Sequence, residues 1–207
     1  MASTEFDPGS MSTREFYKLL TSVVVPRPIA WVSSTSAAGV DNLAPHSFFT
    51  VSCVDPPVVQ FTSVGRKDSL RNIEATGEFV VNLAPESLFE QVNATATDFP
   101  EDLGEFGAVG VHGEPGKRVR PQRVTESPVA LECRFHGSLC LGNSHVVLGR
   151  VVHAAVHEEV MDGDHPEITK LRPLARLGIN EWSTIGEVRA INRISYDEWP
   201  GHYQGDQ

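Results

Sequence analysis

The sequence has 207 residues, which is long enough for one domain with a substantial hydrophobic core. Its 40% hydrophobic and 21% charged residues are ordinary for a globular protein. The formal net charge of −10 argues against a nucleic-acid backbone or an anionic membrane as the main partner, because both are negatively charged. This charge still allows one local basic pocket for a small anionic ligand.

The start of the chain and its cysteines indicate the cellular location of the protein. No run of about 18 apolar residues occurs, and no secretion signal precedes the first predicted strand. Residues 1–10 are polar and end in Gly9-Ser10 before Met11; we interpret them as a leader added for expression or a disordered tail. A single domain over residues 11–207 follows. The three cysteines show no CxxC spacing, which indicates reduced thiols in a cytoplasmic protein.

Six short runs rich in β-branched or aromatic residues predict strands, because each is bounded by Gly, Pro, Asn or Asp. They cover residues 28–34, 47–53, 57–64, 78–83, 129–138 and 145–154. Within the last run, Gly149 predicts a bulge or a bend in a barrel.

Two stretches have the spacing of helices. Residues 67–76 place Leu70 and Ile73 on one face and stop at Gly77, a residue typical of helix ends. Residues 85–96 place Leu88 and Val92 on one face. Strands dominate, so the pattern favours a mostly antiparallel barrel with inserted helices over a doubly wound sheet.

A polar segment rich in Gly and Pro covers residues 97–126. Irregular segments of this length are usually lids or binding loops, or else they are disordered. The residues leave both interpretations open.

The first candidate binding motif joins two predicted strands. One strand ends in the hydroxyl residues Ser33, Ser34 and Thr35, and the next is expected to begin just after residues 42–45. Adjacent antiparallel strands would bring hydroxyls, the Asn42 amide and free backbone N–H groups to one rim. A hairpin with polar decoration and no binding role is the alternative.

The second candidate motif is the stretch from Gly65 to Ser69 at the start of the first predicted helix. A helix N-terminus offers unpaired N–H groups and a partial positive charge. With Lys67 and Ser69 added, this arrangement predicts a phosphate seat. The alternative is a plain helix cap by Asp68 with solvated basic neighbours.

The order of these motifs resembles the flavin reductase-like, FMN-binding split-barrel family. The residues that carry this resemblance are PRPIAWVSS, NLAPHSFF, DPPVVQF, RKDSLRNI and GEFVVNL, followed by ESPVALEC and LARLG. It covers about residues 21–178 and is closest to the flavoredoxin-like branch. The resemblance implies a mainly β fold: a six-stranded antiparallel Greek-key split β-barrel with a few inserted α-helices.

The resemblance also implies roles for individual residues. Residues 33–34 and 42–47 match positions that hold the ribityl chain and the ring edge of FMN, and Lys67 and Ser69 match positions that hold its phosphate. His46 stands where an aromatic residue is common, and Trp182 stands where the family often has Tyr, so substrate preference stays open. The full candidate set is Ser33, Ser34, Thr35, Asn42, Ala44, Pro45, His46, Ser47, Phe48, Arg66, Lys67, Ser69 and Trp182.

The chemistry that the resemblance implies needs no catalytic side chain. A flavin accepts a hydride from NAD(P)H, so the expected activity is that of an NAD(P)H-dependent flavin reductase. The alternatives are a flavoredoxin-like electron carrier and an FMN-binding module without turnover. The expected partners are a second copy of the chain, and a monooxygenase or an electron-transfer protein. No metal site is expected, because His153 and His157 lie about 13 Å apart along a predicted strand.

Overall fold

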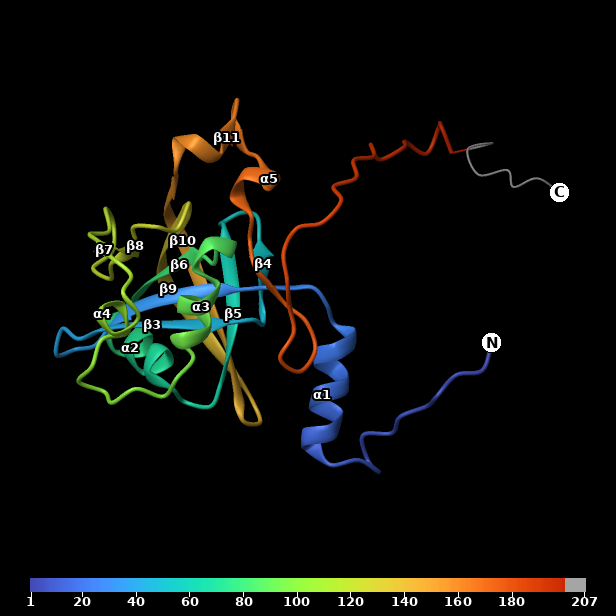
Figure 1. Cartoon of the computed structure of the whole chain (residues 1–207), viewed down its shortest axis with the longest axis horizontal. Coiled ribbons are helices and arrows are strands. Elements are labelled where there is room, and N and C mark those ends of the chain that lie inside the picture. Colours follow the sequence, from blue (N-terminus) through green and yellow to red (C-terminus); the bar gives the residue numbers. More distant parts are fainter. Residues whose placement is uncertain (200–207) are drawn as a thin grey trace.

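The computed structural model describes residues 1–199, and its centre is one antiparallel sheet of seven strands (Figure 1). Across the sheet the strands are β3 (Asp41–His46), β2 (Ala30–Thr35), β6 (Glu78–Leu83), β9 (Val129–Leu141), β10 (Ser144–Val156), β5 (Val58–Val64) and β4 (Phe49–Cys53). The two outermost strands, β3 and β4, are consecutive in the chain, so the sheet curls into an open barrel. Strands β6, β9 and β10 are neighbours, and the earlier strand β5 lies beside β10, which is a Greek-key connection.

The core lies inside this barrel and is closed at one end by helix α2 (Asp68–Thr76). Inward residues such as Phe61, Phe79 and Val147 pack against Leu70 and Ile73 of that helix. A second cluster covers the outer face of β2, where Trp31 and Leu43 meet helices α3 (Phe89–Ala94) and α4 (Glu105–Val109). Strand β2 is therefore buried on both faces along its whole length.

The predicted strands and helices are confirmed, with one correction at the first hairpin. Residues 42–45 were expected to precede a strand, but residues Asp41–His46 form strand β3 themselves, so the main sheet has seven strands rather than six. Asn and Pro are disfavoured in strands, which hid β3 from the sequence pattern. Pro45 is tolerated because β3 is an edge strand and needs only one set of ladder hydrogen bonds.

Helix α1 (Thr13–Val23) was missed. Its start carries a capping box, in which Ser12 accepts from the Glu15 backbone N–H and Glu15 accepts from Ser12. That spacing of Ser and Glu is visible in the sequence. Figure 1 shows α1 beside the barrel, with residues 1–10 leading away from it and exposed.

The polar segment 97–126 is packed against the body of the protein. Phe106, Val111, Val119 and Val124 within it are buried, which favours a structural or binding role over disorder. The remaining short elements are β1 (Arg27–Pro28), η1 (Glu86–Leu88), β7 (Gly113–Glu114), β8 (Arg123–Val124), η2 (Glu158–Val160), β11 (Met161–Asp162), β12 (His165–Pro166), α5 (Ile168–Leu171), β13 (Ala175–Arg176) and β14 (Trp182–Ser183). Within residues 1–199, no helix combines the length and the apolar character that crossing a membrane requires. The last eight residues of the predicted domain lie outside the described part of the chain.

Candidate functional site

A pocket of about 220 Å³ lies between strand β3, the end of β5, the start of α2 and the segment after α3. Most of the predicted cofactor-binding residues line it: Asn42, Ala44, Pro45, His46, Ser47, Phe48, Lys67 and Ser69. The two motifs that the sequence singled out therefore meet at one place, because β3 runs past the N-terminus of α2.

The hydroxyl residues of β2 lie behind this pocket. The Ser34 hydroxyl is buried and donates to Asn42 Oδ1 at 3.4 Å, so it supports the pocket wall from behind. Ser33 donates to the backbone carbonyl of Gln122, and Thr35 donates to the Asp41 carboxylate. The expected meeting of polar strand ends is thus confirmed, although these three side chains do not line the pocket.

Two further predicted residues lie outside the pocket. Arg66 forms an ion pair with Glu74 at 2.5 Å on the surface of α2. Trp182 packs edge-on against Phe89, and the guanidinium of Arg176 lies 4.5 Å from its ring centre. Neither side chain touches the pocket in this single chain.

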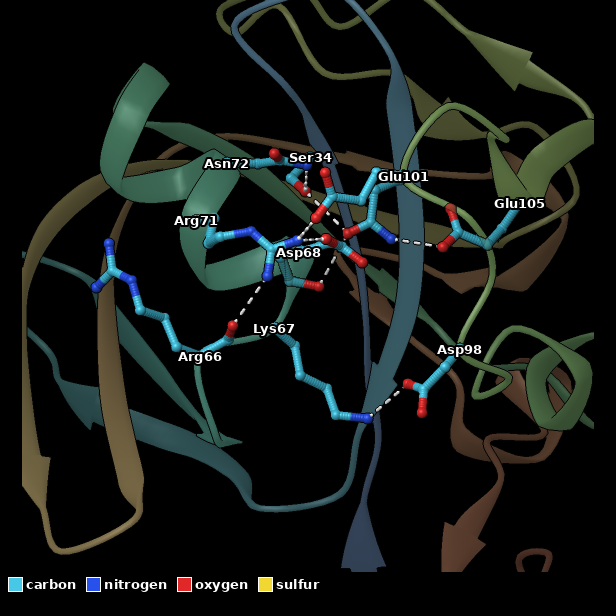
Figure 2. A network of polar contacts seen from close by, with 11 residues as sticks. Ser34, Arg66, Lys67, Asp68, Arg71, Asn72, Asp98, Glu101 and Glu105 are labelled. Carbon is cyan, nitrogen blue, oxygen red and sulfur yellow. Dashed lines mark hydrogen bonds and ion pairs between the residues drawn. The ribbon is translucent and has the colours of Figure 1, made fainter.

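Asn42 is the centre of the polar contacts in the wall. Its amide donates to one oxygen of the buried Glu105 carboxylate at 2.9 Å, and the other oxygen accepts from the Leu43 backbone N–H. Glu105 therefore fixes the amide so that Asn42 Oδ1 faces the hydroxyls of Ser34 and Ser69. Figure 2 shows Glu105, the first residue of α4, reaching this network.

The start of α2 has the features of an anion seat. Lys67 is the N-cap residue, and no side chain caps the helix, so Asp68 does not play the capping role weighed above. The first N–H groups of the helix are consequently without a side-chain acceptor. The Ser69 hydroxyl and the Lys67 ammonium lie at the same end and line the pocket.

A sequence model of the flavin reductase like domain matches residues 22–173. The chain belongs to this family. A relative of unassigned function from Deinococcus radiodurans is 36% identical over 217 aligned positions, which cover 99% of this chain and 96% of that protein. The sequence resemblance is thus confirmed.

Two solved structures support the fold. Nitrilotriacetate monooxygenase component B from Bacillus cereus superposes with a TM-score of 0.89 at 29% identity, over 92% of this chain and 100% of that one. A flavin reductase with a split barrel domain from Shewanella frigidimarina gives 0.84 at 19% identity, over 93% and 100% of the two chains. The predicted split-barrel fold is therefore confirmed.

His46 contributes an imidazole ring to the wall of this pocket. Its ring centre lies 4.5 Å from that of Phe61, and its Nε2 lies 3.4 Å from Ser69 Oγ. Burial lowers the pKa of His46 from 6.5 to about 4; a backbone hydrogen bond with Thr62 raises this pKa by less than burial lowers it, and the charge of Lys67 has the smallest effect, which lowers it. The ring is therefore neutral at pH 7 and brings no positive charge to an anion.

This lowered pKa predicts a pH-dependent stability. Between about pH 6.5 and about pH 4 the unfolded chain binds a proton at His46 that the folded chain does not. The contribution of His46 to the free energy of unfolding is thus fully present above this range and is lost as the pH drops through it. Between about pH 7 and about pH 5, we expect the free energy of unfolding to decrease by about 1 to 2 kcal/mol less in His46→Gln than in wild type, as measured by urea unfolding at the two pH values.

The control for His46 is the interval from about pH 7 to about pH 8, where this ring is neutral in both states. Wild type and His46→Gln should change stability equally there. An equal change between about pH 7 and about pH 5 as well would contradict the lowered pKa.

Sequence reasoning missed the residues that close the pocket of this flavin reductase relative from other elements. They are Tyr17 from α1, Thr62, Ser63 and Val64 from β5, and Asp68, Thr95, Ala96, Thr97, Asp98 and Glu105. Tyr17 reaches the pocket because Arg27 anchors α1: its guanidinium donates to the carbonyls of Thr21, Val24 and Leu177. The capping box at Ser12 is the signal that could have found this helix.

Proposed function

We propose that this protein binds FMN in the pocket at the start of α2 and works as an NAD(P)H-dependent flavin reductase. The observation that carries the proposal is the meeting of an uncapped helix N-terminus, Lys67 and Ser69 in one pocket of a flavin reductase-like fold. These groups suit a phosphate, because N–H and hydroxyl donors and an ammonium all favour an anion.

The rest of the pocket suits the uncharged part of FMN. Ala44 and Pro45 of strand β3, and Ser47 just after it, line the pocket and offer backbone groups for the ribityl chain and ring edge. Bound FMN supplies the hydride and electron chemistry. The chain's own residues bind and orient it, and the neutral His46 packs at the wall without acting as an acid.

Dimer formation is part of the proposal. The volume of about 220 Å³ is below the roughly 300–1,000 Å³ of typical cofactor sites, so one chain encloses only part of FMN. Helix α1 exposes Tyr17, Leu20 and Val23 beside the pocket, and the C-terminal segment exposes Ile185 and Val188. These exposed apolar residues favour an interface in which a second copy of the chain buries them.

The similarity to a monooxygenase component B supports a partner enzyme that consumes reduced flavin. We therefore propose that this protein supplies reduced FMN to a flavin-dependent monooxygenase. The cytoplasmic location expected from the sequence stays a prediction.

The visible spectrum of the purified protein tests the cofactor, with mass measurement of the released chromophore. We expect flavin bands and the mass of FMN, and oxidation of NADH or NADPH that rises when FMN is added. Colourless protein that also fails to bind added FMN would contradict the proposal. Bound FMN without NADH or NADPH oxidation would favour an electron carrier or a binding module.

Light scattering tests the dimer. We expect a mass of two chains in the FMN-loaded protein. A monomer that retains FMN at full occupancy would contradict the dimer, because one chain would then be enough to bind FMN.

A further inference from the structure

Every cation at the start of α2 is already paired with a carboxylate. Figure 2 shows Lys67 extended toward Asp98, and their Nζ and Oδ1 atoms lie 2.9 Å apart. Arg71 pairs with Glu101 at 2.6 Å and with Asp68. The basic cluster that the sequence suggests is thus neutralised by residues from its own helix and from the segment after α3.

The balance of charge inside the pocket is negative. Within residues 1–199, Lys67 is the one cationic side chain that lines it, whereas Asp68, Asp98 and Glu105 line it with carboxylates. A phosphate brings about 1.5 to 2 further negative charges at neutral pH. An ammonium shared between a carboxylate and a phosphate holds each more weakly than it would hold one alone, because the two anions repel each other.

We propose that Asp98 competes with the flavin phosphate for Lys67 and so makes FMN an exchangeable ligand; this rests on the proposed function. Asp98 is a specificity-determining residue in this sense, since it weakens the binding of flavins that carry a phosphate and does not affect the binding of those that lack one. Its carboxylate pairs with the Lys67 ammonium when the phosphate is absent, and it separates from the ammonium when the phosphate binds.

The geometry allows this exchange without unfolding the segment. The Asp98 side chain is 88% exposed and that of Lys67 is 57% exposed, so their ion pair is weak and the carboxylate can turn into water. The Arg71–Glu101 pair holds the same segment three residues further on. Rotation of one side chain is therefore enough to release Lys67. A reductase that hands FMN to a partner needs such release.

The test compares the affinities of FMN and riboflavin, which lacks the phosphate, for wild type, Asp98→Asn and Asp102→Asn. Asp102 is the matched control: it is an exposed acid in the same segment, and it forms no ion pair within residues 1–199. We expect Asp98→Asn to bind FMN about three- to tenfold more tightly, mostly through slower release. Riboflavin affinity should stay within about twofold of wild type, and Asp102→Asn should change neither affinity beyond that range.

The outcomes separate this inference from the proposed function. An equal affinity for FMN in Asp98→Asn and Asp102→Asn would overturn the inference that Asp98 competes with the phosphate. An equal increase in the affinities for FMN and riboflavin in Asp98→Asn would also overturn it, since the effect would then not involve the phosphate. Wild-type protein that binds neither flavin would instead remove the proposed function itself.

Discussion

Replacing Lys67 with alanine is expected to weaken FMN binding by about tenfold to a hundredfold. Lys67 is the cation that lines the pocket beside the start of α2. A hydrogen bond between charged groups contributes about 1.5–3 kcal/mol, which corresponds to this range of affinity. Without the ammonium, the Asp98 carboxylate also loses its partner and adds repulsion toward the phosphate. Fluorescence titration with FMN measures the change.

Riboflavin and a second lysine provide the controls for Lys67→Ala. Riboflavin affinity should change little, because the lysine acts on the phosphate. Lys117 is exposed and lies outside the pocket, so Lys117→Ala should leave both affinities at the wild-type value. Unchanged FMN affinity in Lys67→Ala would move the phosphate seat to another part of the protein.

Adding one methyl group at Gly149 is expected to lower the free energy of unfolding by about 2 to 3 kcal/mol. A Cβ atom there would lie 2.2 Å from Cζ of Phe79 and 3.1 Å from Cβ of Cys133. The Phe79 ring cannot retreat, because it is fully buried and packs edge-on against Phe61. For a chain of this length the melting temperature should fall by about 5 to 10 °C in Gly149→Ala, measured by calorimetry.

Gly137 is the matched control on the neighbouring strand. It pairs with Leu148 in the same β9–β10 ladder, and a Cβ there would meet no atom within 4 Å. We expect Gly137→Ala to change the free energy of unfolding by less than about 0.5 kcal/mol. Similar losses in both variants would mean that the ladder tolerates no methyl group, whatever the space.

The bulge at Gly149 shows how far a local pattern reaches. A glycine inside a strong strand pattern predicted a bend, and the register between β9 and β10 shifts between Leu148 and Gly149. The sequence does not name the neighbour that requires a glycine. That neighbour is Phe79 on β6, about 70 residues earlier, and only the closed barrel brings the two together.

The candidate site likewise has some features that the sequence predicted and others that depend on the tertiary structure. The N-terminal start of α2 and the polar strand end at Ser34 are local features, so residue type and spacing predicted them. Strand β3 was missed because Asn42 and Pro45 oppose strand propensity, and its place at the sheet edge, a tertiary property, makes them acceptable.

The sequence by itself determined six of the seven strands of the main sheet, helix α2 at the proposed phosphate seat, and the family to which the chain belongs. These depend on short-range periodicity, on Gly77 as a helix end, and on an ordered series of motifs. Only the tertiary structure decided the charge and the walls of the seat. Asp98 meets Lys67, and Glu105 orients Asn42, across 31 and 63 residues of chain. Coulombic and hydrogen-bonded contacts depend on distance in space, and no local pattern encodes that distance.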